Sequence, residues 1–204
     1  YTMSLNKFTD AEASLPLRLE AGFKKLIVDE LLVKGASPSS KFRSSGTATL
    51  FNNTTPESMF PTGFGSLTLP EGELVEGSAY EASFQGVFEA GIGAQVLFVL
   101  GLGAGASVPC GSLQYTWASG STGIQNFKVN VKLVAFLDGG VLESIRSYVE
   151  FVAEDGSVVF KGSDNPQFTL PFDQVQDLDF TMTVTNVSGT TEFVVQSAEL
   201  NRVR

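Results

Sequence analysis

The sequence predicts an all-β protein, an antiparallel β-sandwich built as a single jelly roll of about eight strands with an extended N-terminal arm. Residues 125–136, QNFKVNVKLVAF, alternate apolar and polar side chains, as a strand with one buried and one solvent-facing side does. From Thr47 onward, short apolar runs alternate with turn residues and leave no room for helices between strands. Both patterns are typical of sheets covered on one side only.

The chain divides into an arm with its linker, 1–46, and a jelly-roll domain, 47–204. Within the arm, residues 17–35 (LRLEAGFKKLIVDELLVKG) combine helical spacing with runs that favour extended chain, and we favour the extended form. Residues 37–46, SPSSKFRSSG, are rich in Ser and read as a linker. The sequence therefore predicts one folded domain preceded by a reaching segment.

The predicted strands follow one another closely along the domain. EDGS at 154–157 predicts a tight hairpin, and 178–185 predicts a strand with Asp179 and three threonines facing outward. Residues 142–148, LESIRSY, could form one helical turn. The candidate strands are 47–53, 64–70, 79–90, 94–103, 112–119, 125–136, 147–154, 157–161, 166–172, 178–186 and 191–200.

Charge is distributed unevenly along the chain. The net charge is −9; residues 1–46 carry seven Lys/Arg against five Asp/Glu, whereas 47–204 carry six against seventeen. Not one Lys or Arg lies between Ser44 and Phe127. Because a nucleic-acid phosphate backbone requires a cationic surface, we expect no direct nucleic-acid binding by the jelly-roll domain, 47–204. No apolar run approaches the roughly 18 residues of a transmembrane helix.

Several kinds of chemistry find no support in the residues. Histidine is absent, which excludes Ser-His-Asp and Cys-His hydrolases, and the single Cys110 cannot supply a zinc site or an intramolecular disulfide. Gly101, Gly103 and Ala106 fit a loose dinucleotide-loop pattern, but Pro109 follows where a helix would have to grow. We therefore expect no cofactor, and we interpret this stretch as a small-residue loop where chains pack closely.

Acidic residues offer two further alternatives. Asp173, Asp177 and Asp179 gather oxygen ligands suited to Ca²⁺, but their spacing matches no calcium loop, so we expect an acidic rim and no metal site. A glycosidase-like enzyme needs only two carboxylates and stays open as a third hypothesis, although no pair can be nominated. The candidate carboxylates are Glu71, Glu73, Glu76, Glu81 and Glu89.

Aromatic residues in 112–119 bear on carbohydrate binding. Tyr115 and Trp117 would form a sugar-binding platform if they were exposed. Tyr115 and Trp117 follow Leu113 at every second position, so the three side chains would lie on the same face of a strand. We favour the face that packs on the core. A non-catalytic carbohydrate-binding β-sandwich or receptor-binding head remains the alternative to the assembly function developed next.

Residues 51–90 carry a recurring pattern: NTT-P-E near Asn53, then GFGSLTLP, then a V-x-G-x-x-Y strand that begins near Val75. This pattern resembles single jelly-roll virion proteins of large DNA viruses, of the minor-capsid or penton kind. The later elements also follow the order found in that family. They are an aliphatic strand, then the 125–136 strand after a Trp-containing segment, and finally a pair that carries T-x-T-V-T-N and E-L. KKLIVDELLVKG also resembles the extended segments that precede such jelly rolls.

The resemblance implies a non-enzymatic structural protein located in the virion capsid and assembled in the host cell. It implies a homo-oligomer, a pentamer or a trimer, together with other capsid proteins as partners. We expect no catalytic residue, no cofactor and no metal. The expected assembly contacts are Leu26, Ile27, Leu31, Leu32 and Val33 in the arm, with Lys128 and Lys132 on the solvent-facing side of 125–136.

Overall fold

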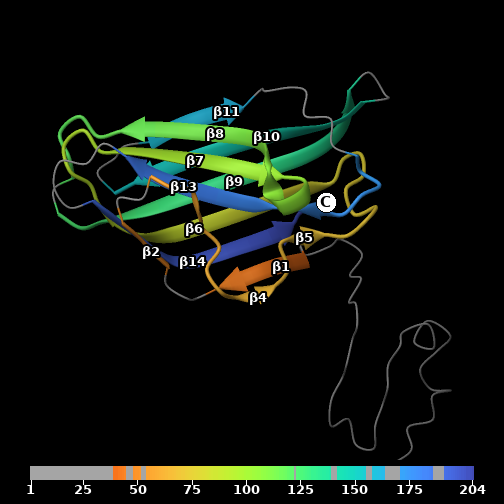
Figure 1. Cartoon of the computed structure of the whole chain (residues 1–204), viewed down its shortest axis with the longest axis horizontal. Coiled ribbons are helices and arrows are strands. Elements are labelled where there is room, and N and C mark those ends of the chain that lie inside the picture. The colour runs from red at the N-terminus through yellow and green to blue at the C-terminus, as the bar shows by residue number, and fades with distance from the viewer. Residues whose placement is uncertain are drawn as a thin grey trace, which may run out of the picture. The chain divides into compact units, whose positions relative to one another are not determined.

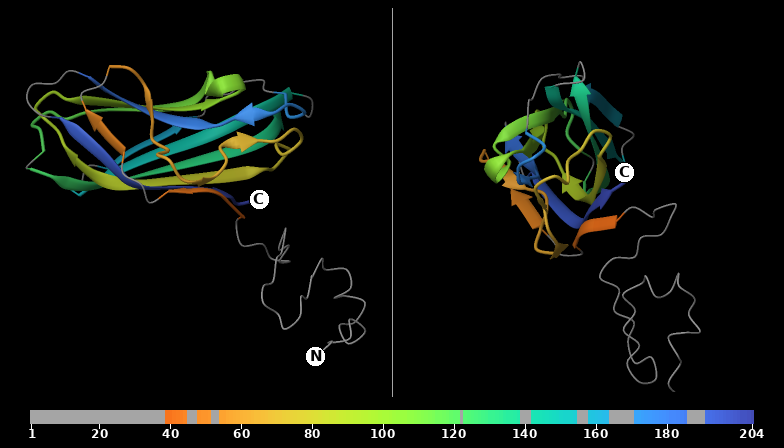
Figure 2. Two further views of the ribbon diagram at one scale, coloured as in Figure 1. Left: turned by 60° about the horizontal axis from the view of Figure 1, so that its bottom comes forward. Right: turned by 90° about the vertical axis from the view of Figure 1, so that its right-hand side faces the viewer.

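The structure, a computed structural model, describes residues 39–44, 48–51, 54–121, 123–138, 142–154, 158–163, 171–185 and 191–204. These residues form two antiparallel sheets packed face to face, seen from three sides in Figures 1 and 2. The predicted all-β antiparallel sandwich is therefore confirmed. Residues 1–38 of the N-terminal arm, with its five nominated contacts, lie outside the described residues.

The larger sheet contains eight strands and the smaller sheet four. The order in the large sheet is β11 (Val158–Ser163), β10 (Leu142–Ala153), β9 (Gln125–Asp138), β6 (Ala79–Glu89), β14 (Glu192–Arg202), β1 (Ser39–Ser44) and β4 (Phe64–Gly65), with β2 (Ala48–Phe51) also paired to β14. The order in the small sheet is β3 (Glu57–Ser58), β13 (Asp179–Thr185), β7 (Gln95–Leu102) and β8 (Val108–Thr116). A two-stranded ladder joins β5 (Thr68–Leu69) to β12 (Gln176–Asp177), and a 3-10 turn, η2 (Ala104–Ala106), follows β7.

Strand pairs are nested along the chain. Strand β6 pairs with β14, β7 pairs with β13, and β9 pairs with β10, all antiparallel. Such nesting is how an eight-stranded jelly roll wraps. The other two strands of this set of eight are β8, at one end of the small sheet, and β11, at one end of the large sheet. They contact each other where the two sheets meet. In Figure 1 the small sheet lies in front of the large one.

The core fills the space between the two sheets with alternate residues of each strand. Strand β13 turns Phe180, Met182 and Val184 inward, as predicted, and Thr181 and Thr185 outward. Thr183, the third threonine predicted to be outward, is buried. Strand β9 is flanked by β6 and β10, which makes it a central strand. Its buried residues are the predicted Phe127, Val129, Val131, Leu133 and Ala135.

Aromatic rings dominate this core. Phe88 from β6 stacks on Phe193 of β14 with centroids 5.4 Å apart, and its ring lies 5.2 Å from that of Trp117. Phe180 stacks on Phe84 at 5.2 Å and on Phe98 at 5.9 Å, so it links the two sheets. Offset and edge-to-face pairs of this kind stabilise a core beyond the burial of their area.

Two stretches fold differently from what their sequences predict. Ser39–Ser44, within the predicted linker, is strand β1, between β14 and β4, because its one large apolar residue, Phe42, enters the core. The possible helical turn at 142–148 is instead part of β10. There Ser147 faces the core, and its hydroxyl donates a 2.6 Å hydrogen bond to the carbonyl oxygen of Cys110. The bond satisfies a polar group that the pattern alone would place outside.

An ion cluster fastens β1 to the loop that precedes β6. The Glu73 carboxylate, 8% exposed, pairs with the Lys41 ammonium and accepts a 2.9 Å hydrogen bond from the Tyr80 hydroxyl. Burial, together with the bond to Glu73, raises the pKa of Tyr80. The cluster therefore holds β1 against the rest of the sandwich.

Strands β10 and β11, which flank the hairpin predicted at 154–157, pair antiparallel from Val152 opposite Val158 onward, and residues 155–157 lie outside the described residues. Among the described residues, no helix has the length and apolar character needed to cross a membrane.

Candidate functional site

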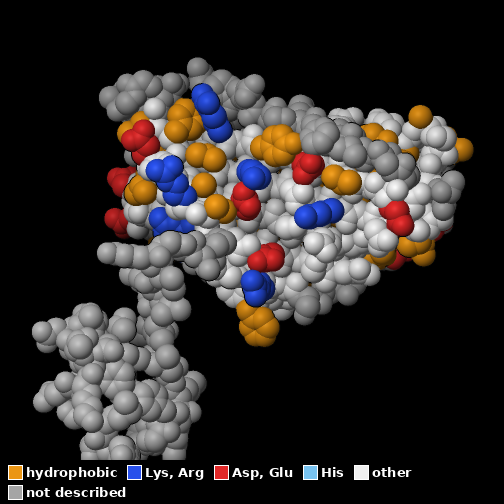
Figure 3. Space-filling view, turned by 180° about the vertical axis from the view of Figure 1, so that it is seen from behind, with side chains coloured by type: hydrophobic (Ala, Val, Ile, Leu, Met, Phe, Trp, Pro, Cys, Tyr) orange, Lys and Arg blue, Asp and Glu red, His pale blue; other side chains and the backbone are white. Residues whose placement is uncertain are grey.

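The outer face of the large sheet carries the cations of the sandwich. Figure 3 views this face, with Lys and Arg side chains interspersed among carboxylates. In the described ranges, every Lys and Arg belongs to a strand of the large sheet or directly follows one: Lys41, Arg43, Lys128, Lys132, Arg146, Lys161, Arg202 and Arg204. The described cations, which are unevenly distributed along the sequence, therefore belong to the large sheet and not to the small one.

Charged pairs cross this face from strand to strand. Lys132 of β9 lies opposite Glu81 of β6, and its ammonium is 2.7 Å from the carboxylate. The hydrogen bond to Glu81 raises the pKa of Lys132. At the β1 edge, hydrogen bonds from Asn201 and from Arg43 lower the pKa of Glu199. Exposed pairs of this kind contribute little stability, about 0–1 kcal/mol each.

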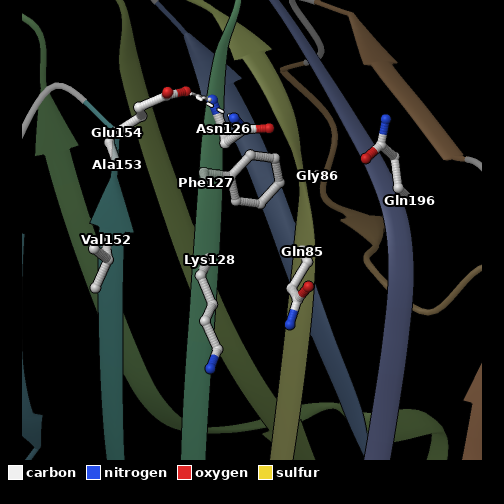
Figure 4. Close-up of a pocket in the computed structure, with 9 residues that line it drawn as sticks. All are labelled: Gln85, Gly86, Asn126, Phe127, Lys128, Val152, Ala153, Glu154 and Gln196. Carbon is white, nitrogen blue, oxygen red and sulfur yellow. Dashed lines mark hydrogen bonds between the residues drawn. The ribbon is translucent and has the colours of Figure 1, made fainter.

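A hollow of about 430 Å³ opens on this face between β10, β9, β6 and β14. Figure 4 shows the Phe127 ring near its centre, with Asn126 and Glu154 to one side and Lys128 and Gln85 to the other. The Glu154 carboxylate accepts hydrogen bonds from the Asn126 backbone and side-chain amides at 3.0 and 2.7 Å. The complete lining is Gln85, Gly86, Asn126, Phe127, Lys128, Val152, Ala153, Glu154 and Gln196.

The hollow exists because of two local features. A β-bulge shifts the register of β14 against β6 between Val195 and Ser197, so that Gln196 is extra and exposed. Opposite Phe127 stands Gly86, where a Cβ would meet the Val194 carbonyl oxygen at 1.9 Å. Only glycine fits there, because a Cβ would also meet the Phe127 ring at 3.0 Å.

The outer face of the small sheet differs sharply. Its cross-strand rows place Thr181 beside Val99 and Ser112, Thr183 beside Leu97 and Gln114, and Thr185 beside Gln95 and Thr116. We call these nine residues the neutral array. Leu97 is 37% exposed, Gln114 and Thr116 are exposed, Thr183 is buried, and the others are half-buried. None of the nine carries a charge.

The structure places Trp117 in the core and Tyr115, half-buried, against it, on the inward side that their alternation with Leu113 favoured. Trp117 is 2% exposed, and Tyr115 packs edge-on against it with centroids 4.7 Å apart. The sugar-binding platform that the carbohydrate alternative required of these two rings is therefore not formed. Cys110 is also buried, which raises the pKa of its thiol to about 12 and leaves it unreactive.

Two of the three acidic residues considered for calcium, Asp177 and Asp179, have structural partners. Asp177 accepts hydrogen bonds from the Thr68 hydroxyl at 2.9 Å and the Gly105 amide at 3.0 Å, while Asp179 accepts one from the Ser58 hydroxyl at 2.6 Å. In the described part of the chain, no group of three potential ligands is placed to hold a metal. These carboxylates fasten loops to strand ends.

Two other motifs also have structural roles. Gly101 lies where a Cβ would approach the Ala106 carbonyl oxygen to 2.2 Å, which matches the predicted close-packed small-residue loop. Of the candidate glycosidase carboxylates, Glu73 is engaged by Lys41 and Glu81 by Lys132.

The sequence alone did not predict the hollow, although a break in the alternation of one strand indicated a local irregularity there. In 191–200 the inward residues Phe193 and Val195 are followed by Ala198 and Leu200, so the alternation breaks by one residue. Such a break marks a bulge, and bulges often lie beside functional sites.

Comparison with known proteins identifies no family. No family model matches the sequence, and no curated protein matches it. Among solved structures, the chain is similar to peanut lectin in complex with a nine-residue peptide (PVIWSSATG), with a TM-score of 0.37 and 10% sequence identity. The match covers 82% of this chain and 98% of the lectin chain. At that TM-score the similarity carries no argument about function.

Proposed function

We propose that this chain is a non-catalytic structural subunit that assembles with copies of itself, as a penton or minor-capsid protein does in a virion. The resemblance of residues 51–90 to jelly-roll virion proteins supports the proposal at the level of sequence. The observation that carries it in the structure is the neutral array on the small sheet. Although the chain has a net charge of −9, the neutral array offers an uncharged surface through which one copy can contact another.

The physical reason is electrostatic. Copies of an acidic chain repel each other, and a contact surface without charges of its own adds least to that repulsion. The cores of protein interfaces are likewise depleted in charged residues. Leu97 and Val99 give the array an apolar centre, flanked by threonine, serine and glutamine side chains. The charged face of the large sheet then points away from the contact.

A closed ring, a pentamer or a trimer, is the assembly we propose, with other capsid proteins around it and the virion as its location. A ring needs two different contact surfaces on each copy. The neutral array is one, and the arm, with Leu26, Ile27, Leu31, Leu32 and Val33, is the proposed second. Lys128 and Lys132 stay as further candidate contacts, although Lys132 is already paired within its own sheet.

Charging the centre of the neutral array is expected to break the oligomer. Leu97→Lys places an ammonium where two copies meet, and burying it without a partner should weaken association at least about a hundredfold. The measurement is the mass of the full-length chain by light scattering. Val134→Lys is the matched control, because Val134 is 40% exposed on the outer face of the large sheet. A monomeric wild-type chain, or a Leu97→Lys oligomer as stable as wild type, would refute the proposal.

Charging the arm tests the second contact. Leu31→Asp with Leu32→Asp, in the full-length chain, removes apolar anchors and is expected to weaken assembly by about tenfold or more, while the far-ultraviolet circular dichroism of the sandwich stays unchanged. Leu17→Asp, in the same arm but outside the nominated contacts, serves as the control. Equal assembly of the double variant and this control would remove the arm from the proposal.

A further inference from the structure

We propose that Phe64 is an anchor that inserts into a hollow on the small sheet of a second copy of this chain. The inference rests on the proposed self-assembly and names the side chain through which one copy holds the next. Phe64 is 86% exposed, the largest value among the large apolar side chains of the described residues. Single exposed apolar residues are common on protein surfaces, so the inference depends on how this ring is held and what lies beside it.

The ring stands on a rigid support. Phe64 belongs to β4, where it pairs with Arg43 of β1, and a glycine lies on either side of it. A Cβ on Gly63 would lie 2.3 Å from the Arg43 carbonyl oxygen, and one on Gly65 would lie 1.9 Å from the Lys41 carbonyl oxygen. The two glycines therefore let β4 lie directly against β1. An aromatic anchor that is already fixed loses little conformational entropy when it binds.

A hollow suited to one side chain lies on the small sheet, where β7 ends. Its volume is about 260 Å³, slightly below the roughly 300–1,000 Å³ of small-molecule sites. It forms around Gly101, which has no side chain to fill the space between Pro109 and Asp179, its neighbours in the ladder. The turn η2 supplies another part of the lining, so we call this site the η2 hollow.

The apolar lining of the η2 hollow is accessible to a ring. Pro109 is exposed, and Val99 and Ala106 are half-buried. Burying a phenyl ring against these carbon atoms removes apolar surface of both copies from water. Val99 and Thr181 also belong to the neutral array, so the η2 hollow continues the surface through which we propose that copies meet.

Charge complementarity favours this occupant. Asp179 is the one charged residue of the η2 hollow. Both hydrogen bonds that the described residues donate to its carboxylate end on Oδ1, which leaves Oδ2 available. Arg43, beside Phe64, has a 67% exposed side chain and uses one guanidinium nitrogen on Glu199 at 3.2 Å, so other donors remain. The anchor thus brings a cation to the carboxylate of the hollow, which counters the repulsion between acidic copies.

The anchor and the η2 hollow belong to different surfaces of one copy. In Figure 1, β4 ends the large sheet, whereas β7 and β8 lie in the small sheet in front of it. A contact between two unlike surfaces leaves each copy with one anchor and one hollow to offer to its neighbours. Such a contact closes into a ring when the rotation between copies permits, as the proposed trimer or pentamer requires.

Truncating the anchor in the full-length chain tests its contribution. Phe64→Ala is expected to raise the dissociation constant of the oligomer at least about tenfold, measured by light scattering over a range of concentrations. Ile124→Ala is the matched control, because Ile124 is 73% exposed between β8 and β9 and should leave assembly unchanged. Urea unfolding of each variant confirms that the fold is retained.

Cross-linking tests where the anchor binds. Full-length chains carrying Thr62→Cys, two residues before Phe64, are mixed with chains carrying Ser107→Cys, in the η2 hollow, and treated with a short bismaleimide. The native Cys110 is buried, so the introduced thiols react selectively. We expect a cross-linked dimer from this mixture and none when Val134→Cys, on the outer face of the large sheet, replaces Thr62→Cys.

Two outcomes would overturn this inference alone. In one, Leu97→Lys breaks the wild-type oligomer but Phe64→Ala assembles as wild type does. In the other, the oligomer forms but no cross-link joins the Thr62→Cys and Ser107→Cys chains, so the anchor binds elsewhere. A monomeric wild-type chain would refute the proposed self-assembly and the anchor with it. The failure of the anchor is therefore distinguishable from the failure of self-assembly.

Discussion

Phe42→Ala is expected to lower the free energy of unfolding by about 3 kcal/mol. Phe42 is 6% exposed in β1, which lies between β14 and the short strand β4, and its ring meets that of Phe60 edge-on with centroids 5.3 Å apart. Phe60 in turn contacts Phe84, so the substitution opens a cavity at the rim of the main core. Urea unfolding followed by Trp117 fluorescence gives the change in stability directly.

Phe64→Ala is the matched control for this prediction. Phe64 stands in β4, which pairs with β1, but its ring is 86% exposed. Removing an exposed ring changes stability by no more than about 0.5 kcal/mol. If Phe42→Ala were as mild as Phe64→Ala, β1 would not be an integral strand of the sandwich, and the predicted linker would be the better description.

The contrast between these two phenylalanines shows where sequence patterns are sufficient. Residues 125–136 and 178–185 alternate without interruption because each strand has one fully buried side, so the pattern alone predicts their inward residues. SPSSKFRSSG has one large apolar residue in ten, which is too few to reveal a period. Its strand forms because β14 offers a free edge and Phe42 a core contact, and both are tertiary facts.

The candidate surfaces show the same division. The outward threonines of the neutral array follow from alternation, but their lateral neighbours depend on which strands pair and in what register. The hollow depends on a bulge at Gln196 opposite a glycine two strands from Glu154, and no local pattern brings those residues together. The same holds for β10, where Ser147 faces the core because the Cys110 carbonyl oxygen of β8 accepts a hydrogen bond from its hydroxyl.

Phe88→Ala is expected to have the largest effect of any single truncation considered, a loss of about 4 kcal/mol in the free energy of unfolding. Its ring lies within 6.3 Å of four others, those of Trp117, Phe127, Phe151 and Phe193, which come from both layers of the sandwich. Truncation removes the aromatic contacts and leaves a cavity that backbone strands cannot collapse to fill.

Trp117 provides both the readout and the test of mechanism. It is the single tryptophan of the chain and is 2% exposed, so acrylamide should quench it poorly in the wild-type protein. In Phe88→Ala the quenching constant should rise, because the ring loses its neighbour at 5.2 Å. Phe136→Ala removes a half-buried ring that carries only the Arg146 guanidinium, 4.6 Å from its centroid, and should cost about 1 kcal/mol or less. Equal losses for Phe88→Ala and Phe136→Ala would mean that the aromatic cluster is not what holds the two sheets together.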